Sequence, residues 1–169
     1  MEQVRIGIIG TSWWADTMYL PSLAGNEKAV VVACCGRNEE RARKLAEIWN
    51  IPQVYTDWKT MLDEEPLDAL IISTSNSTHC PITLAALEKG LHVLCEKPVA
   101  LNIEELTQLE RVATMSKLYF QEAFMVRYHP QWHWLQELDI GNIQTAHFIF
   151  SYPQQPEGNY RNTSSFGGG

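Results

Sequence analysis

Three small residues near the N-terminus have the spacing of a turn that binds phosphate. They are Gly10, Ser12 and Ala15, within the segment RIGIIGTSWWAD. The dinucleotide-binding pattern G-x-G-x-x-G/A uses such residues for a tight turn, close backbone approach to a pyrophosphate and helix–strand packing. Ser12 replaces the second glycine, but its side chain is small and its hydroxyl can donate to a phosphate oxygen. We expect Ser12 to modify the site rather than abolish it, with helix N-terminal N–H groups facing the anion.

The same turn also has a purely structural explanation. A turn between a strand and a helix of an α/β sheet can carry small residues without binding any nucleotide. Trp13 and Trp14 follow Ser12 directly. Packing under the turn is the simpler interpretation of both rings, and the alternative is that one of them, Trp13, walls a nucleotide cleft.

The segment Cys35-Gly36-Arg37-Asn38 bears on which dinucleotide would bind. It contains no acid that could bond the ribose 2′-hydroxyl, as NAD-selective sites do. Gly36 leaves room for a 2′-phosphate, and Arg37 offers it a fork of donors. The segment therefore favours NADP, with NAD possible. The competing interpretation is that Arg37 is a solvated residue at a helix start and that the cofactor preference is mixed.

Alternating strand and helix patterns must position these residues. Apolar runs predict six strands, at 4–9, 29–35, 53–55, 68–73, 92–98 and 118–124. Helical patterns separate them, at 13–25 (disturbed by Pro21), 38–49, from 57, 80–90 and 103–117. Asn38 is the expected N-cap of the second helix, and Asn102 with Glu105 forms a variant capping box for the last. Strands alternating with helices predict an α/β fold with a doubly wound parallel sheet, the Rossmann architecture.

The pattern changes after about residue 121. Residues 129–138 predict a helix, 144–152 alternate like a half-exposed antiparallel strand, and 153–169 are rich in turn residues. We therefore predict a dinucleotide-binding domain over 1–121. Residues 122–169 would be the start of an incomplete α+β domain.

Charge and composition exclude several classes of function. The chain has 169 residues and a net charge of −7, which argues against nucleic-acid and anionic-membrane partners. No apolar run reaches the ~18 residues of a membrane span, and the N-terminus lacks a signal-peptide layout. The four cysteines form no C-x-x-C pair. We therefore expect a cytoplasmic protein with reduced, buried thiols.

Two histidines have a spacing that occurs in metal sites. His129 and His133 are four residues apart, which would put them on one face of a helix. Metallopeptidases with this spacing need a glutamate after the first histidine. Here Pro130 follows instead and a third ligand is missing, so we predict no metal site.

Further motifs give the chain a family resemblance. Glu96-Lys97-Pro98 follows the fifth strand, with STSNSTHC before it and EAFMVRYHPQ, GNIQTAHF and GNYRNTSSFGGG after it. In this order the motifs resemble the Gfo/Idh/MocA family of NAD(P)-dependent oxidoreductases over essentially the whole chain. EAFMVRYHPQ and the pair Asn159 and Arg161 most resemble the branch that oxidises or reduces sugars and dihydrodiols with NADP.

The resemblance implies a role for each residue of the Glu96-Lys97-Pro98 turn. Lys97 would lie beside the nicotinamide and the substrate, and its ammonium would stabilise negative charge on the substrate oxygen during hydride transfer. Glu96 would buttress the turn, and the peptide before Pro98 is expected to be cis. Other residues with implied places are Ser73, Thr74 and Asn76 along the ribose and pyrophosphate, His79 in helix capping or packing, and Arg127 and His129 towards the nicotinamide.

The activity implied by the resemblance is hydride transfer between NADP and a sugar, polyol or dihydrodiol. The resemblance also implies that the domain beginning at residue 122 serves substrate binding and oligomerisation, and that a full-length form would be a homo-oligomer. The family's acid–base histidine follows the GGG segment, so it would lie beyond residue 169, and we expect this chain to bind cofactor but to turn over little.

Two alternatives are a dinucleotide-binding regulator without catalysis and an assembly domain that binds no nucleotide. The intact Glu96-Lys97-Pro98 favours the enzyme over the regulator.

Overall fold

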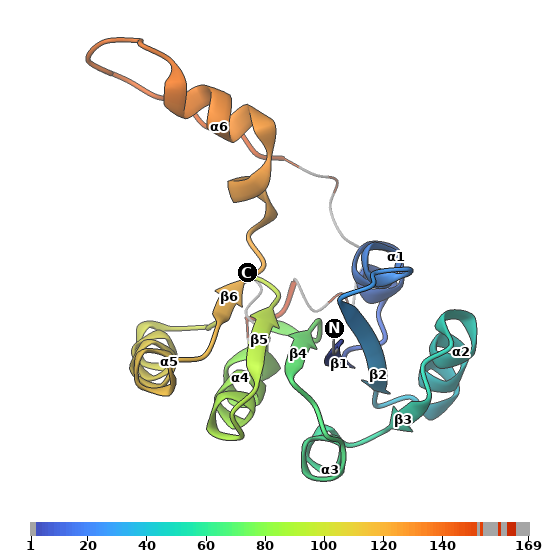
Figure 1. Ribbon diagram of the computed structural model, residues 1–169. Coiled ribbons are helices and arrows are strands. Elements are labelled where there is room, and N and C mark those ends of the chain that lie inside the picture. Colours follow the sequence, from blue (N-terminus) through green and yellow to red (C-terminus); the bar gives the residue numbers. More distant parts are fainter. Residues whose placement is uncertain (1–2, 152, 154–158, 160–161, 165–169) are drawn as a thin grey trace. The chain divides into compact units, whose positions relative to one another are not determined.

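The computed structural model describes residues 3–151, 153, 159 and 162–164. The chain divides into two compact units, Met1–Ala123 and Phe124–Gly169. The first unit contains the sheet and the helices that cover it, and the second contains a short helical segment (Figure 1).

Six parallel strands form one sheet in the first unit. They are β1 (Val4–Ile9), β2 (Ala29–Cys35), β3 (Gln53–Tyr55), β4 (Ala69–Ile72), β5 (His92–Cys95) and β6 (Phe120–Glu122). Their order across the sheet is β3-β2-β1-β4-β5-β6, with parallel pairing throughout. The predicted doubly wound Rossmann sheet is therefore confirmed. Because the chain reverses its direction of travel between β1 and β4, the crevice at the carboxyl ends of these two strands is where such folds bind ligands.

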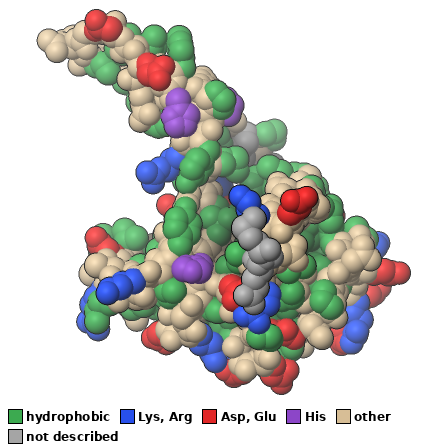
Figure 2. All heavy atoms as spheres, in the orientation of Figure 1, with side chains coloured by type: hydrophobic (Ala, Val, Ile, Leu, Met, Phe, Trp, Pro, Cys, Tyr) green, Lys and Arg blue, Asp and Glu red, His purple; other side chains and the backbone are tan. Residues whose placement is uncertain are grey.

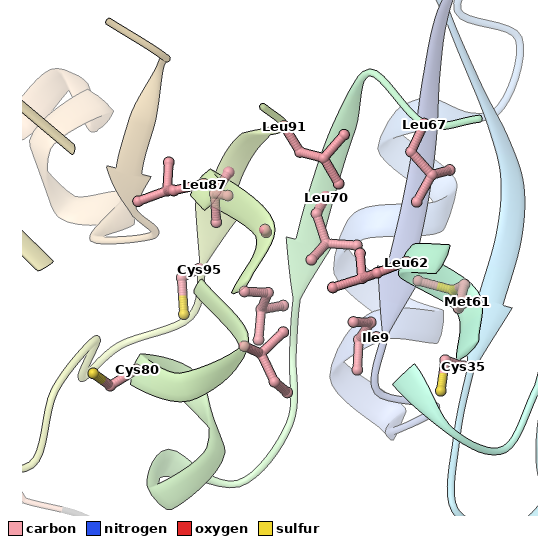
Figure 3. Packing of buried hydrophobic residues seen from close by; sticks show 14 of the residues in the cluster. Ile9, Cys35, Met61, Leu62, Leu67, Leu70, Cys80, Leu87, Leu91 and Cys95 are labelled. Carbon is pink, nitrogen blue, oxygen red and sulfur yellow. The ribbon is translucent and has the colours of Figure 1, made fainter. Parts of the chain in front are cut away.

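Helices cover both faces of the sheet. Successive side chains of a strand point to opposite faces, so Ile8 packs in one apolar cluster and Ile9 in the other. Figure 3 shows the second cluster, where Met61 and Leu62 approach the sheet beside Ile9. The covering elements are a π-helical turn η1 (Ala15–Tyr19) continuing into α1 (Leu20–Leu23), α2 (Glu39–Trp49), α3 (Trp58–Glu64), a 3₁₀ turn η2 (Asn76–Thr78), α4 (His79–Glu88) and α5 (Ile103–Ser116).

Two helix starts agree with the capping residues predicted from the sequence. The Asn38 side chain accepts a hydrogen bond from the Arg41 N–H at 2.8 Å. Asn102 accepts one from the Glu105 N–H at 2.8 Å, and Glu105 reaches back to the Leu101 N–H at 2.8 Å. The variant capping box is confirmed. These caps fix where α2 and α5 begin, and with them the loops at the carboxyl edge of the sheet.

The second unit differs from its prediction in one element. It contains a 3₁₀ turn η3 (Met125–Tyr128) and α6 (Pro130–Glu137), close to the predicted helix. The predicted strand over 144–152 is wrong, because the described part, 144–151, has no strand. An alternating segment becomes a strand only when its backbone groups pair with a neighbour, and no described segment of this unit forms a ladder with it. Most of the predicted turn-rich segment, including Arg161, lies outside the described residues.

Two further observations concern the described residues as a whole. No helix among them is both long and apolar enough to cross a membrane. The four cysteines, Cys34, Cys35, Cys80 and Cys95, are buried and form no disulfide.

Candidate functional site

The turn after β1 lies against the end of β4. Gly10 has a φ of +113°, and a Cβ on this residue would lie 2.2 Å from the carbonyl oxygen of Ser73. The Ser73 N–H donates to the Ile9 carbonyl at 2.7 Å, which holds the two strand ends together. Only glycine fits this backbone without strain or collision. Gly10 is therefore required by the protein's own main chain, apart from any ligand.

Ser12 directly precedes the helical residues Trp13 and Trp14, which lead into η1. Its carbonyl accepts the first intrahelical hydrogen bond, from the Asp16 N–H at 3.2 Å. Its hydroxyl lies 3.4 Å from the Ala15 N–H and 3.4 Å from the hydroxyl of Ser73. Ala15 is fully buried, as close packing of helix on strand requires. The structure thus brings Gly10, Ser12, Ala15 and Ser73 together at the ends of β1 and β4.

The helix after this turn contains a π-helical segment. The Leu20 N–H donates to the carbonyl of Ala15, five residues earlier. Pro21 explains the widened turn, because proline has no N–H and its ring collides with the carbonyl four residues before it, here that of Thr17. The sequence indicated a disturbance at Pro21, but residue periodicity gave no indication of its form.

Glu96 is a buried carboxylate that ties this helix to the end of β5. It is 8% exposed, and its Oε1 accepts hydrogen bonds from the Trp14 Nε1 and the Tyr19 hydroxyl, both at 2.6 Å. Its Oε2 accepts a longer bond from the Lys97 N–H at 3.3 Å. Burial, and then the hydrogen bond to Glu96, raises the pKa of the Tyr19 phenol well above its usual range. Tyr19 therefore remains a hydrogen-bond donor at any physiological pH.

His79 connects the turn after β5 to the turn after β4. The peptide between Lys97 and Pro98 is cis, and the side chain of Lys97 is exposed. His79 is 1% exposed; its Nδ1 lies 2.7 Å from the Pro98 carbonyl oxygen and its Nε2 lies 3.2 Å from that of Thr74. The ring donates to one of these oxygens when neutral and to both when protonated. His79 therefore packs inside the site and bridges two of its turns.

The turn after β2 is held by packing against the turn after β1. The Gly36 N–H donates to the Tyr55 carbonyl at 3.0 Å. A Cβ on Gly36 would lie 2.5 Å from Oγ1 and 2.7 Å from Cγ2 of Thr11. Because Gly36 has no side chain, Thr11 can pack against it. This packing is a separate reason for a glycine here, besides any room that it leaves for a ligand. Arg37, the next residue, is exposed.

The two adjacent tryptophans have different environments. Trp14 turns inward to Glu96, whereas Trp13 is 69% exposed, and their ring centroids are 5.9 Å apart. Packing under the turn thus describes Trp14 and is wrong for Trp13. A place for Trp13 along a cofactor stays a prediction.

Two further predicted site residues, Asn76 and Arg127, lie in 3₁₀ turns. Asn76 opens η2, directly after Thr74 and Ser75. Arg127 lies in η3 of the second unit and is exposed, so its role stays a prediction. Sequence reasoning missed Thr11, Trp14 and Tyr19 as residues of the site. Pro21, inside a helical pattern, was the one signal in the sequence that this helix could contain a π turn. In such a turn residues five apart, such as Trp14 and Tyr19, can share a face.

No metal centre is evident among the described residues, and charges of both signs are mixed on one face of the molecule. Among the described residues, no three His, Cys, Asp or Glu side chains gather as ligands would. The Nδ1 of His129 instead accepts a hydrogen bond from the Gln131 N–H at 3.2 Å. On the face drawn in Figure 2, Lys and Arg side chains are interspersed with Asp and Glu.

Comparisons with known proteins identify relatives that are oxidoreductases. D-xylose 1-dehydrogenase (NADP(+)) 2 of Haloferax volcanii is 32% identical over 89% of this chain and 47% of its own length. An uncharacterized oxidoreductase of Rhizobium meliloti is 35% identical over 100% of this chain and 52% of its own. This chain thus spans about half the length of these relatives.

Solved structures show the same fold. A 3-ketoreductase from Actinomadura kijaniata, in complex with TDP-benzene and NADP, superposes with a TM-score of 0.89 at 30% identity, over 99% of this chain and 53% of that one. A myo-inositol 2-dehydrogenase from Lactobacillus plantarum gives a TM-score of 0.75 at 26% identity, over 80% and 40% of the two chains. The model of the Gfo/Idh/MocA oxidoreductase family, NAD-binding Rossmann fold, matches residues 4–124. The chain belongs to this family of oxidoreductases.

Proposed function

We propose that this chain binds NADP(H) and serves a dehydrogenase or reductase that acts on a sugar, polyol or dihydrodiol. The observation that carries the proposal is that side chains connect two turns. The phosphate-binding turn at Gly10 and Ser12 is joined through Trp14 and Glu96 to the turn that carries Lys97. A cofactor lying across the ends of β1, β4 and β5 would therefore extend from one turn to the other.

The residues present fit such a cofactor. Because Gly10 has no Cβ, the turn lies close to the end of β4. Ser12 lies at the start of the helix, where the first N–H groups favour an anion. Ser73 and Thr74 directly follow β4, at the same edge of the sheet. The fork of Arg37 is suited to a 2′-phosphate because it offers several donors and a full charge. The relatives named above include an NADP(+)-dependent dehydrogenase and a structure with NADP bound.

Lys97 is the residue we assign to the chemistry. When bound, the nicotinamide donates or accepts the hydride. The exposed ammonium of Lys97 hydrogen-bonds the substrate oxygen and stabilises the negative charge that develops there. Relatives that act on D-xylose and on trans-1,2-dihydrobenzene-1,2-diol support a vicinal diol or sugar as the substrate class.

Cofactor titration tests the binding part of this proposal. The chain contains six tryptophans, so quenching of their fluorescence follows the addition of NADPH or NADH. We expect tighter binding of NADPH. Ser12→Gly should change the affinity by no more than about 1 kcal/mol, the scale of one net hydrogen bond, whereas Ser12→Leu should abolish binding by filling the approach to the pyrophosphate. Normal binding by Ser12→Leu would show that the cofactor does not lie over this turn.

Absorbance of NADPH, followed with aldoses, polyols and dihydrodiols, tests the assignment of Lys97. The assay uses a version extended beyond residue 169, because we expect the chain of 169 residues to turn over little by itself. In the extended version, Lys97→Ala should remove turnover and leave the affinity for NADPH largely intact. Turnover that survives Lys97→Ala would assign the chemistry to another residue.

A further inference from the structure

We propose that Trp14 and Tyr19 are positioning residues for Lys97, which they place by holding Glu96. The inference rests on the proposed role of Lys97. It assigns to the first helix of the fold a second task, because the helix that begins at the phosphate-binding turn also fixes the turn after β5.

The spacing of the two donors is the first observation. Trp14 and Tyr19 are five residues apart, and in an α-helix, at about 100° per residue, they would point about 140° away from each other. Here both reach Oε1 of Glu96 at 2.6 Å. The π turn over Ala15–Tyr19 makes this possible, since residues five apart follow one another along a π-helical face. Single π turns inside helices are frequent at functional sites.

The anchoring of Glu96 is the second observation. Its main-chain N–H donates to the Ile72 carbonyl at 2.9 Å, and its Oε1 is bound by the two aromatic donors. This leaves Oε2 directed at the Lys97 N–H, 3.3 Å away. On the other side of Lys97, the Pro98 carbonyl oxygen is held by His79 at 2.7 Å. Lys97 therefore lies between two anchored neighbours, while its own side chain is exposed.

Trp14, Tyr19 and Glu96 carry polar groups because hydrogen bonds, unlike apolar contacts, are directional. A buried apolar residue at position 96 could fill the same space, but it would not fix the orientation of the turn. Groups that act on a reacting atom must be held within a fraction of an ångström, and the residues behind them supply that precision. Trp14 and Tyr19 supply it from the helix that faces the pyrophosphate, so one element sets the distance between the two parts of the site.

Three phenylalanine substitutions test the proposal with a matched control. Trp14→Phe and Tyr19→Phe keep an aromatic ring and remove one donor to Glu96. The control is Trp49→Phe, because the Trp49 indole donates to Asp16 on this same helix at the same distance, 2.6 Å, without touching Glu96. The readout is hydrogen exchange of the Lys97 amide, measured by NMR in the chain without cofactor. Exchange at the buried amide of Ile8 in β1 serves as the reference for global unfolding.

We expect Trp14→Phe and Tyr19→Phe to speed exchange at Lys97 by roughly tenfold relative to Ile8, the effect of losing a hydrogen bond to a charged group. Trp49→Phe should leave this ratio within about twofold. Tyr19→Phe removes a single hydroxyl, so it decides the question should Trp14→Phe fail to fold. An unchanged ratio in Tyr19→Phe, or an equal rise in Trp49→Phe, would overturn the proposal.

Addition of NADP⁺ separates this proposal from the proposed function. If the wild-type Lys97 amide signal does not shift with saturating NADP⁺, the proposed cofactor placement is wrong, and the exchange ratios measured without cofactor still decide whether Trp14 and Tyr19 hold the turn. If the signal shifts in the wild type and in Trp49→Phe but is reduced in Tyr19→Phe, both proposals are supported.

Discussion

The turns after β2 and after β5 each carry one cation that we assign to the cofactor or its chemistry, and they are held by different means. Around Lys97, buried polar groups make directed bonds: Glu96 to the first helix, and His79 to the turn after β4. Around Arg37, the support comes from Gly36, through a main-chain hydrogen bond to the Tyr55 carbonyl and through packing against Thr11. The side chains of Arg37 and Lys97 are both exposed.

The difference follows from what each cation is expected to do. A group that stabilises charge at a reacting atom must be placed within a narrow range of distance, because catalysis depends steeply on geometry. A cation that recognises a phosphate acts through charge as well as contact, and a flexible side chain can still find it. We therefore expect substitutions near Lys97 and the strand ends beside it to change stability, and substitutions at Arg37 to change cofactor preference alone.

The largest effect is expected from the innermost turn. Gly10→Ala would force a positive φ on alanine and place its Cβ against the Ser73 carbonyl. We expect it to lower the free energy of unfolding by roughly 3–5 kcal/mol and to abolish cofactor binding. Gly25→Ala is the control, because Gly25 also has a positive φ, +74°, but nothing lies within 4 Å of its Cβ position. Urea unfolding measures both, and equal costs would show that the contact with Ser73 is unimportant.

His79→Leu tests the polar support of the Lys97 turn. It would leave the carbonyls of Pro98 and Thr74 without the ring that bridges them. A buried group without its partner costs about 1–3 kcal/mol, so we expect a loss of stability of about 2 kcal/mol. His79→Asn retains a donor and should lose less. A His79→Leu protein as stable as the wild type would mean that the bridge contributes nothing.

Arg37→Ala tests the exposed end of the site. We expect roughly tenfold weaker binding of NADPH, about 1.4 kcal/mol, with unchanged affinity for NADH and unchanged stability. Arg41→Ala removes the same charge from the exposed surface of α2 and is the control. A substitution at Gly36 would not test the cofactor preference alone, because any side chain there would collide with Thr11. A loss of stability in Arg37→Ala would contradict the distinction between the two turns.

The smallest effect is expected at Asp68, directly before β4 and at the end opposite the site. Arg5 binds Asp68 through its Nε at 3.0 Å and Nη2 at 2.8 Å, and these hydrogen bonds lower the pKa of Asp68 to about 2. The pKa of Asp68 in the folded protein lies below its value in the unfolded chain. The ion pair with Arg5 therefore stabilises the folded protein fully above about pH 5, and this contribution is lost as the pH falls towards 2. Both side chains are partly exposed, so we expect no more than about 1 kcal/mol. Thermal unfolding of Asp68→Asn should lose this part of the acid dependence, with cofactor affinity unchanged.

Much of the fold could be predicted because local sequence and burial agree in the first unit. Strands β2 and β4, and β1 from Ile6 onward, are apolar on both faces, as a sheet covered on both sides requires. Asn38 and Asn102 mark helix starts by a local hydrogen bond. The motif residues could be assigned to the strand ends for the same reason. Parallel strands bring their carboxyl ends to one edge.

The parts that could not be predicted depend on contacts between distant segments. Alternation over 144–152 suggested a strand, but pairing decides whether a strand forms. Trp14 and Tyr19 meet Glu96 across more than 70 positions of the sequence, and the π turn that aligns them breaks the periodicity used to predict helices. Thr11 becomes important only because Gly36 lies against it.

The central claim is that one cofactor spans the turns at Arg37, Gly10 and Lys97. Mapping of amide chemical shifts with ligand fragments tests it most directly. We predict that adenosine 2′,5′-bisphosphate shifts the signals of Gly36 and Arg37 and leaves Lys97 unchanged, and that NADP⁺ shifts these signals together with those of Gly10, Ser73 and Lys97. A shift of Lys97 by the bisphosphate, or no shift of Gly10 by NADP⁺, would contradict this account of the site.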